Sequence, residues 1–269
     1  MKSNYIYSKN YDNSYIASSN KMGGKKRGEY IYVEGEFDEK VFRKSRAEIG
    51  NLFRGIGTKE KVIRIVKNSE TDCKGIVDMD HDLKGDEISF TDKIVDTNNA
   101  CCLFGHLVKN CNEENILIRF CKEIIGKLNL DNAEKIEAYN QLDEEKDVFL
   151  EFIYNLTIID LFKGKYNDST PKEKREKINW ILVTINMDGE LKKLVESNNF
   201  RKFNDYRTNE VKREEIGLND HAFEDAIRCL VGKYTNDYQK KIKFELTRII
   251  LRDFDKLNPD ISSIVKKLA

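Results

Sequence analysis

Two stretches of the sequence decide the fold: Tyr30–Asp38, which reads YIYVEGEFD, and Gly75–Asp80, which reads GIVDMD. Each begins as a short run of apolar, aromatic or β-branched residues, which is typical of a buried strand, and each run ends in acidic residues. Apolar residues at helical spacing follow the first stretch, from Asp38 to about Phe53. We therefore expect a strand that ends at Glu34, a helix after it, and a later strand that ends at Asp78.

Further strands are predicted at Val62–Val66 and at Ile88–Phe90. Strands separated by a helix within so short a stretch predict an α/β fold with a small, mostly parallel sheet flanked by helices. In such sheets, sites form outside the carboxyl ends of the strands. Glu34, Asp78 and Asp80 fall at these ends.

From about Asp96 onward the apolar spacing becomes helical, with one additional strand expected at Trp180–Ile185. We predict a flexible basic arm over 1–28, an α/β domain over 29–110, and a mainly helical domain over 111–269.

The composition excludes some classes of protein and leaves others open. No apolar run approaches the roughly 20 residues that span a bilayer, and the first residues lack the apolar core of a secretion signal. We therefore expect a cytoplasmic protein that is not in a membrane. The 47 basic and 47 acidic side chains balance, so net charge gives no independent support for nucleic-acid binding. The six cysteines form no zinc-knuckle or disulfide pattern, so we expect reduced thiols.

The acidic residues suit a divalent cation. In an extended Asp-x-Asp, here Asp78 and Asp80, both side chains lie on one face of the strand. Mg²⁺ prefers oxygen ligands and commonly takes one or two carboxylates together with water and substrate phosphate. Clustered carboxylates repel one another unless a cation lies between them. A metal site built from Glu34, Asp78 and Asp80 is the hypothesis that follows.

These motifs resemble the Toprim family. Val33–Phe42 is similar to the family's first motif, a strand-end Glu-Gly followed by Asp and an amphipathic helix, and Gly75–Asp80 is similar to its Asp-x-Asp motif. Within the family the resemblance points to the AriB-like Toprim effector subunit of PARIS anti-phage defence systems. Thr91-Asp92 and Asp96 stand where that branch has Thr-Asp and an acidic helix start. A later Gly-His-Asp motif is echoed by Asp220-His221-Ala222.

The resemblance implies a Mg²⁺-dependent (or Mn²⁺-dependent) endonuclease that cleaves DNA or RNA, with tRNA among the candidates. It further implies a toxic effector of phage defence, restrained by an ABC-type ATPase partner and, by analogy, homo-oligomeric.

The nuclease hypothesis assigns a role to each of these acidic and basic residues. Glu34, Asp78 and Asp80 would hold the ion, although Glu34 is alternatively a general base. Asp38 would be an outer or second-ion ligand. Asp96 completes the expected metal set. On the helix after Glu34, Lys40 and Arg43 would contact nucleic-acid phosphate, with exposed helix charges as the alternative interpretation.

One departure from the branch favours a competing interpretation: Asn98 stands where the branch has an acid, which weakens a second metal site. In the later motif Ala222 replaces an acid and Asp220 replaces Gly, so no mechanistic role is assigned to His221. The alternative is a non-catalytic Toprim-like module that binds nucleic acid or an ATPase. A primase or topoisomerase fragment ranks lower, because the chain lacks their additional domains.

Overall fold

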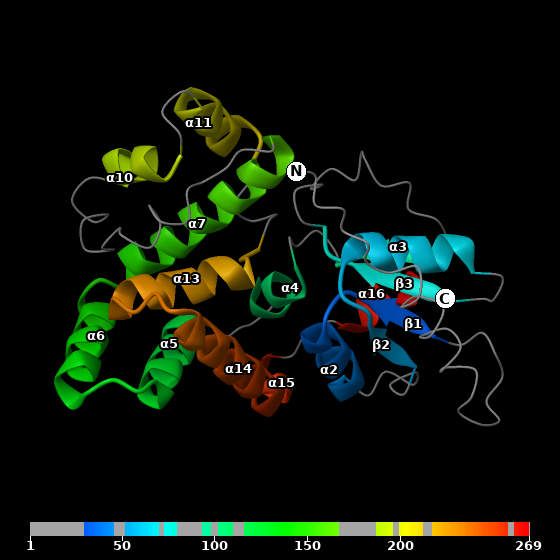
Figure 1. Cartoon of the computed structure of the whole chain (residues 1–269), viewed down its shortest axis with the longest axis horizontal. Helices are drawn as coiled ribbons and strands as arrows, with labels where there is room; N and C mark the ends of the chain where they lie inside the picture. The colour runs from blue at the N-terminus through cyan, green and yellow to red at the C-terminus, as the bar shows by residue number, and fades with distance from the viewer. Residues whose placement is uncertain are drawn as a thin grey trace, which may run out of the picture.

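The computed structural model describes residues 30–45, 52–69, 73–79, 93–97, 102–109, 116–166, 187–195, 199–211, 217–257 and 261–268. Within these residues, four strands form one sheet in the order β2-β1-β3-β4, and every neighbouring pair is parallel. The strands are β1 (Ile31–Val33), β2 (Phe53–Gly55), β3 (Lys74–Val77) and β4 (Ile94–Asp96). The predicted α/β class with a small parallel sheet is confirmed (Figure 1).

Helices cover both faces of this sheet. α2 (Glu36–Lys44) connects β1 to β2 and buries Val41 and Phe42. The Phe42 ring stacks on Phe53 of β2, with centroids 4.9 Å apart. α3 (Lys59–Asn68) connects β2 to β3 and packs Val62 and Val66 into a separate small core on the opposite face. Side chains along each strand alternate between the two faces of the sheet, so the strands contribute apolar residues to a core on each face.

The prediction of a strand at Val62–Val66 is wrong, because these residues lie within α3. Thr58 begins the helix, with its hydroxyl oxygen accepting a hydrogen bond from the Lys61 N–H at 3.4 Å. Val62 and Val66 are four residues apart, so both project from one side of the helix toward the sheet. Burial on that side outweighs the modest preference of β-branched residues for strands.

Two neighbouring predictions are also corrected. The helix expected to continue to Phe53 has its last helical residue at Lys44, and Phe53 instead opens β2. Asp96, expected at the start of the helical region, is the last residue of β4. The reason is strand pairing: Asp96 lies opposite Val77, so this segment forms a parallel strand beside β3.

The C-terminal region is largely helical, and its last helix, α16, lies beside the sheet (Figure 1). The remaining helices are α4 (Leu103–Lys109), α5 (Ile116–Lys127), α6 (Asn132–Glu144), α7 (Lys146–Tyr166), α10 (Met187–Leu194), α11 (Phe200–Asn209), α13 (Asp220–Val231), α14 (Asn236–Arg252), α15 (Phe254–Leu257) and α16 (Ile261–Lys266).

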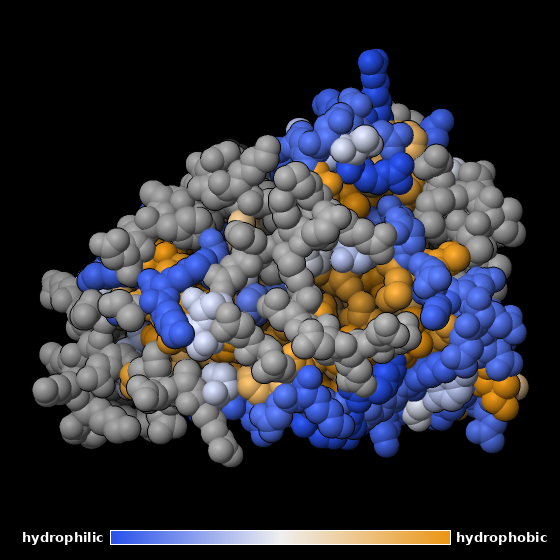
Figure 2. Space-filling model, turned by 180° about the vertical axis from the view of Figure 1, so that it is seen from behind, coloured by the Kyte–Doolittle hydropathy of each residue, from blue (hydrophilic) through white to orange (hydrophobic). Residues whose placement is uncertain are grey.

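One large hydrophobic core runs from β1 through the helices to Leu268, so the sheet and the helical region share it across the predicted boundary at residue 110. The end of the chain returns to the sheet: Lys74 of β3 donates a hydrogen bond to the Leu268 carbonyl, and Lys267 pairs with Asp96. On the face seen in Figure 2, charged and polar side chains occupy much of the rim and apolar ones gather nearer the centre.

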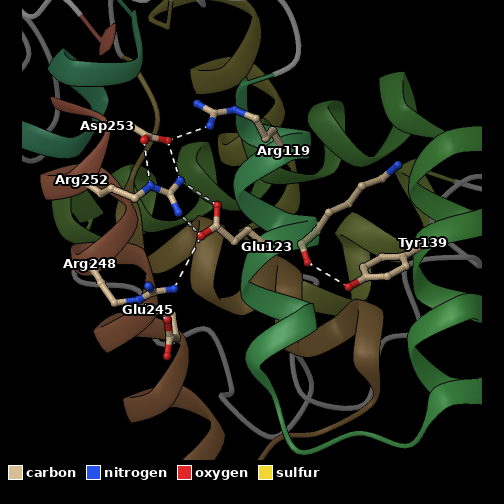
Figure 3. A network of polar contacts seen from close by, with 8 residues as sticks. Arg119, Glu123, Tyr139, Glu245, Arg248, Arg252 and Asp253 are labelled. Carbon is tan, nitrogen blue, oxygen red and sulfur yellow. Dashed lines mark hydrogen bonds and ion pairs between the residues drawn. The ribbon is translucent and has the colours of Figure 1, made fainter. Parts of the chain in front are cut away.

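An ion-pair network ties α5 to α14 (Figure 3). Arg252 donates to the Asp253 carboxylate at 2.8 and 2.7 Å and to Glu123 at 2.8 Å, and Arg119 donates to Asp253 at 2.7 Å. These bonds hold the pKa of Asp253 well below its usual range, with Arg252 as the largest cause. Asp253 is only 4% exposed, so the two arginines compensate for its loss of water.

Several predictions fall outside the described residues. These are the arm over 1–28, Asp80, the strand at Ile88–Phe90, Asp92, Asn98 and the strand at Trp180–Ile185.

Candidate metal centre

Glu34 and Asp78 meet where the strand order reverses. The chain moves from β1 outward to β2 and then back across β1 to β3, so the carboxyl ends of β1 and β3 form a topological switch point. There the Asp78 backbone N–H donates to Glu34 Oε1 at 2.7 Å. Asp78 Oδ1 in turn accepts a hydrogen bond from the Leu103 N–H at 3.0 Å, at the start of α4. The two predicted acids are thus brought together.

The Glu-Gly turn after β1 is fixed by close backbone packing. Gly57 N–H donates to the Glu34 carbonyl at 2.6 Å. A Cβ on Gly55 would lie 2.6 Å from the Gly35 carbonyl oxygen, so only glycine fits there. Asp38 Oδ2 accepts a hydrogen bond from Gly35 N–H at 2.8 Å. The turn therefore holds both Glu34 and Asp38 at the same edge of the sheet.

Asp38 faces a second group of charged residues. Burial raises the pKa of the Asp38 carboxyl to about 6, with the Gly35 hydrogen bond opposing that shift. The charge of Asp220 raises this pKa further, and that of Lys243 lowers it. Asp38 therefore lies near the start of α13 and near α14, which packs against α2.

The predicted phosphate-contacting side chains form pairs along α2. Lys40 pairs with Glu36 at 2.8 Å, and Arg43 pairs with Glu39 at 2.5 Å. Glu39 also accepts a hydrogen bond from the Gly55 N–H at 2.7 Å. These i,i+4 pairs fit the alternative interpretation as helix charges, while contact with nucleic acid stays a prediction.

Asp96, at the end of β4, pairs with Lys267. Its carboxylate accepts a hydrogen bond from Lys267 at 2.8 Å. Side chains alternate along β4, so Asp96 lies on the same face of the sheet as Ile94, which belongs to the small core under α3. Asp78 instead contacts α4, whose apolar residues belong to the large core.

A separate cluster occupies the first turn of α13. Asn219 begins the helix, its side-chain oxygen accepting from His221 N–H at 2.8 Å. Asp220, His221 and Glu224 offer ligand atoms that all lie within 4.8 Å of one another. His221 Nδ1 is 3.8 Å from Glu224 Oε2. Within the described part of the chain, neither Glu224 oxygen has a hydrogen-bond partner, although the residue is only 1% exposed.

Charges within this cluster shift its pKa values. Contact with the Glu224 carboxylate, followed by the charge of Asp220, raises the pKa of His221 to about 9. Burial raises the pKa of Glu224, against the opposing effect of His221. Lys243 lowers the pKa of both groups.

Two glycines bring the start of α13 against α4. A Cβ on Gly105 of α4 would lie 2.5 Å from the Leu218 carbonyl oxygen. Gly217 has a φ of +63°, and its own Cβ would lie 3.2 Å from the Gly105 backbone. Cys102 donates from Sγ to the Leu218 carbonyl at 3.4 Å. The Asp78 carboxylate accepts a hydrogen bond from the first N–H of α4. This short helix therefore connects the pair Glu34 and Asp78 with the cluster at the start of α13.

Sequence reasoning gave little weight to His221 and did not identify Glu224 or Lys243. One signal was present: Asn219 is a favoured helix-starting residue, and Asp220 and Glu224 follow it four residues apart. That Glu224 faces inward depends on how α13 packs against α7, which the local sequence does not indicate.

Comparisons with protein-family models, curated proteins and solved structures found no match to this chain. Of the helices that the structure describes, none has both the length and the apolar character needed to cross a membrane.

Proposed function

We propose that this chain is a Toprim-like, divalent-metal-dependent endonuclease whose ion is held by Glu34 and Asp78, with Asp80 as a further ligand. The observation that carries the proposal is the 2.7 Å hydrogen bond from Asp78 N–H to Glu34, which joins acids from two strand ends at the switch point. An all-oxygen donor set of this kind fits Mg²⁺ or Mn²⁺.

The residues of the chain would prepare this site in two ways. The hydrogen bond from the Asp78 N–H orients Glu34 and favours its ionised form, which both a metal ligand and a general base require. The Leu103 N–H likewise orients Asp78 and favours its ionised form. A bound ion would polarise the scissile phosphate and lower the pKa of an attacking water.

The wider role follows from the resemblance alone. We propose a nucleic-acid substrate, DNA or RNA with tRNA among the candidates, and a toxic effector role in phage defence. An ABC-type ATPase partner, a homo-oligomeric assembly and a cytoplasmic location belong to the same proposal.

A second candidate is a non-catalytic module that binds nucleic acid or an ATPase. The observation that favours it is that Glu34 and Asp78 each accept a backbone hydrogen bond that stabilises the fold. In this alternative the acids connect β1, β3 and α4 and have no catalytic role.

Isosteric amides separate these functions. Glu34→Gln and Asp78→Asn each keep an oxygen that can accept the same backbone hydrogen bond, while the negative charge needed by a metal is lost. Purified wild type should cleave DNA, mRNA or tRNA in Mg²⁺, and each amide variant, as well as Asp80→Asn, should lose cleavage at unchanged thermal stability.

Asp205→Asn is the matched control, because Asp205 is exposed on α11 in the helical region. It should cleave as the wild type does. Cleavage that survives in both Glu34→Gln and Asp78→Asn would exclude the proposed site. Specific nucleic-acid binding without any cleavage by the wild type would favour the non-catalytic module.

A further inference from the structure

The first turn of α13 contains an acid whose burial the nuclease site does not explain. Glu224 is 1% exposed, and among the described residues neither of its carboxylate oxygens has a hydrogen-bond partner. Burying an ionised carboxylate is costly unless it is hydrogen-bonded, paired or bound to a metal. His221 Nδ1 is 3.8 Å from Glu224 Oε2, beyond hydrogen-bond distance.

The residues around Glu224 form a donor set. Asp220 precedes it by four positions and His221 by three, so all three side chains lie over the same turn of helix. Their ligand atoms already lie within 4.8 Å of one another. The His221 side chain is 60% exposed, so it has room to turn toward a bound ion.

We propose that Asp220, His221 and Glu224 bind one divalent transition-metal ion. One imidazole nitrogen with two carboxylates suits Zn²⁺ or Mn²⁺ better than Mg²⁺, which takes oxygen ligands. The ion would neutralise the buried Glu224 carboxylate. This inference concerns metal binding alone and does not depend on the nuclease proposal.

The residues that face the cluster from other helices define the competing explanation. Asp38 of α2 and Lys243 of α14 interact electrostatically with it. Without a metal, a protonated His221 together with Lys243 would balance the acids. A metal site and a simple ion pair therefore predict different responses to added Zn²⁺.

The chain has only three histidines, His81, His106 and His221, so their ring nitrogens can be followed individually by NMR of ¹⁵N-histidine-labelled full-length protein. Resonances are assigned with His221→Ala. Stoichiometric Zn²⁺ should shift the His221 ring nitrogens and leave those of His106, which is buried in α4, unchanged. The same shift should occur in Glu34→Gln/Asp78→Asn, which separates this site from the proposed nuclease site.

Glu224→Gln should bind Zn²⁺ at least about ten-fold more weakly in a calorimetric titration, because it loses an anionic ligand. Glu137→Gln, at an exposed position of α6, is the matched control and should bind as the wild type does. If Glu224→Gln does not fold, Asp220→Asn, at a half-buried position, provides the same test. Absence of a Zn²⁺-dependent shift at His221, or undiminished affinity in the folded variant, would overturn the inference.

Discussion

Replacing Gly105 by alanine tests whether close packing of α4 holds the two groups of acids together. The new Cβ would lie 2.5 Å from the Leu218 carbonyl oxygen and 3.0 Å from the Leu218 nitrogen. Both obstacles are backbone atoms, so α4 and the turn before α13 would have to separate by about 0.9 Å to reach ordinary contact. Overpacking of this kind costs about 1–3 kcal/mol.

Alanine also improves helix propensity at this position by about 0.5–1 kcal/mol, which opposes the steric cost. We therefore expect Gly105→Ala to lower the free energy of unfolding by about 1–2 kcal/mol, measured by urea denaturation.

Gly126→Ala is the matched control within α5. Its nearest neighbour would be the Tyr139 hydroxyl at 3.0 Å, the end of a side chain that can move. The gain in helix propensity should dominate, so this variant should be as stable as the wild type or more stable. If Gly105→Ala is also as stable as the wild type, the close approach of α4 to Leu218 is refuted.

Two further substitutions test the rest of the fold. Asp253→Asn should destabilise the protein by about 1–3 kcal/mol at pH 7, because it removes a carboxylate that pairs with both Arg252 and Arg119. Because the folded-state pKa of Asp253 is depressed, its contribution to the free energy of unfolding is present above about pH 4 and is lost as the pH falls toward the folded-state pKa. The urea denaturation curves of wild type and variant should therefore converge at low pH. A stability difference that does not change with pH would contradict this assignment. Phe42→Ala should cost about 3–5 kcal/mol in urea denaturation, because the fully buried ring stacks on Phe53; a loss below about 1 kcal/mol would show that this contact is not part of the core.

Glu34 and Asp78 could be predicted from the sequence as strand-end acids, because the pattern that indicates them is local. β1 and β3 are apolar runs that pass directly into Glu34 and Asp78, and parallel strands bring their carboxyl ends to one edge. The hydrogen bond between these two residues follows from that topology.

Other features depend on contacts between segments far apart in the chain. Val62 and Val66 fit a strand by composition, and only their shared position on one helix side, against the sheet, makes them helical. Asp96 is a strand residue because β3 lies beside it. Asp220 lies near Asp38 only after α2, α13 and α14 have packed, so no local pattern near either residue predicts that the two acids interact.

The most direct test of the central claim is Mn²⁺-induced broadening of backbone amide signals. The N–H groups of Asp78 and Leu103 lie beside the carboxylates of Glu34 and Asp78. In a His221→Ala background, which removes a ligand of the second proposed ion site, a paramagnetic ion held by these acids should broaden both amide signals at substoichiometric Mn²⁺, and adding Glu34→Gln should abolish the effect. Sharp Asp78 and Leu103 signals in the presence of Mn²⁺, or equal broadening in Glu34→Gln, would contradict a metal centre at the ends of β1 and β3.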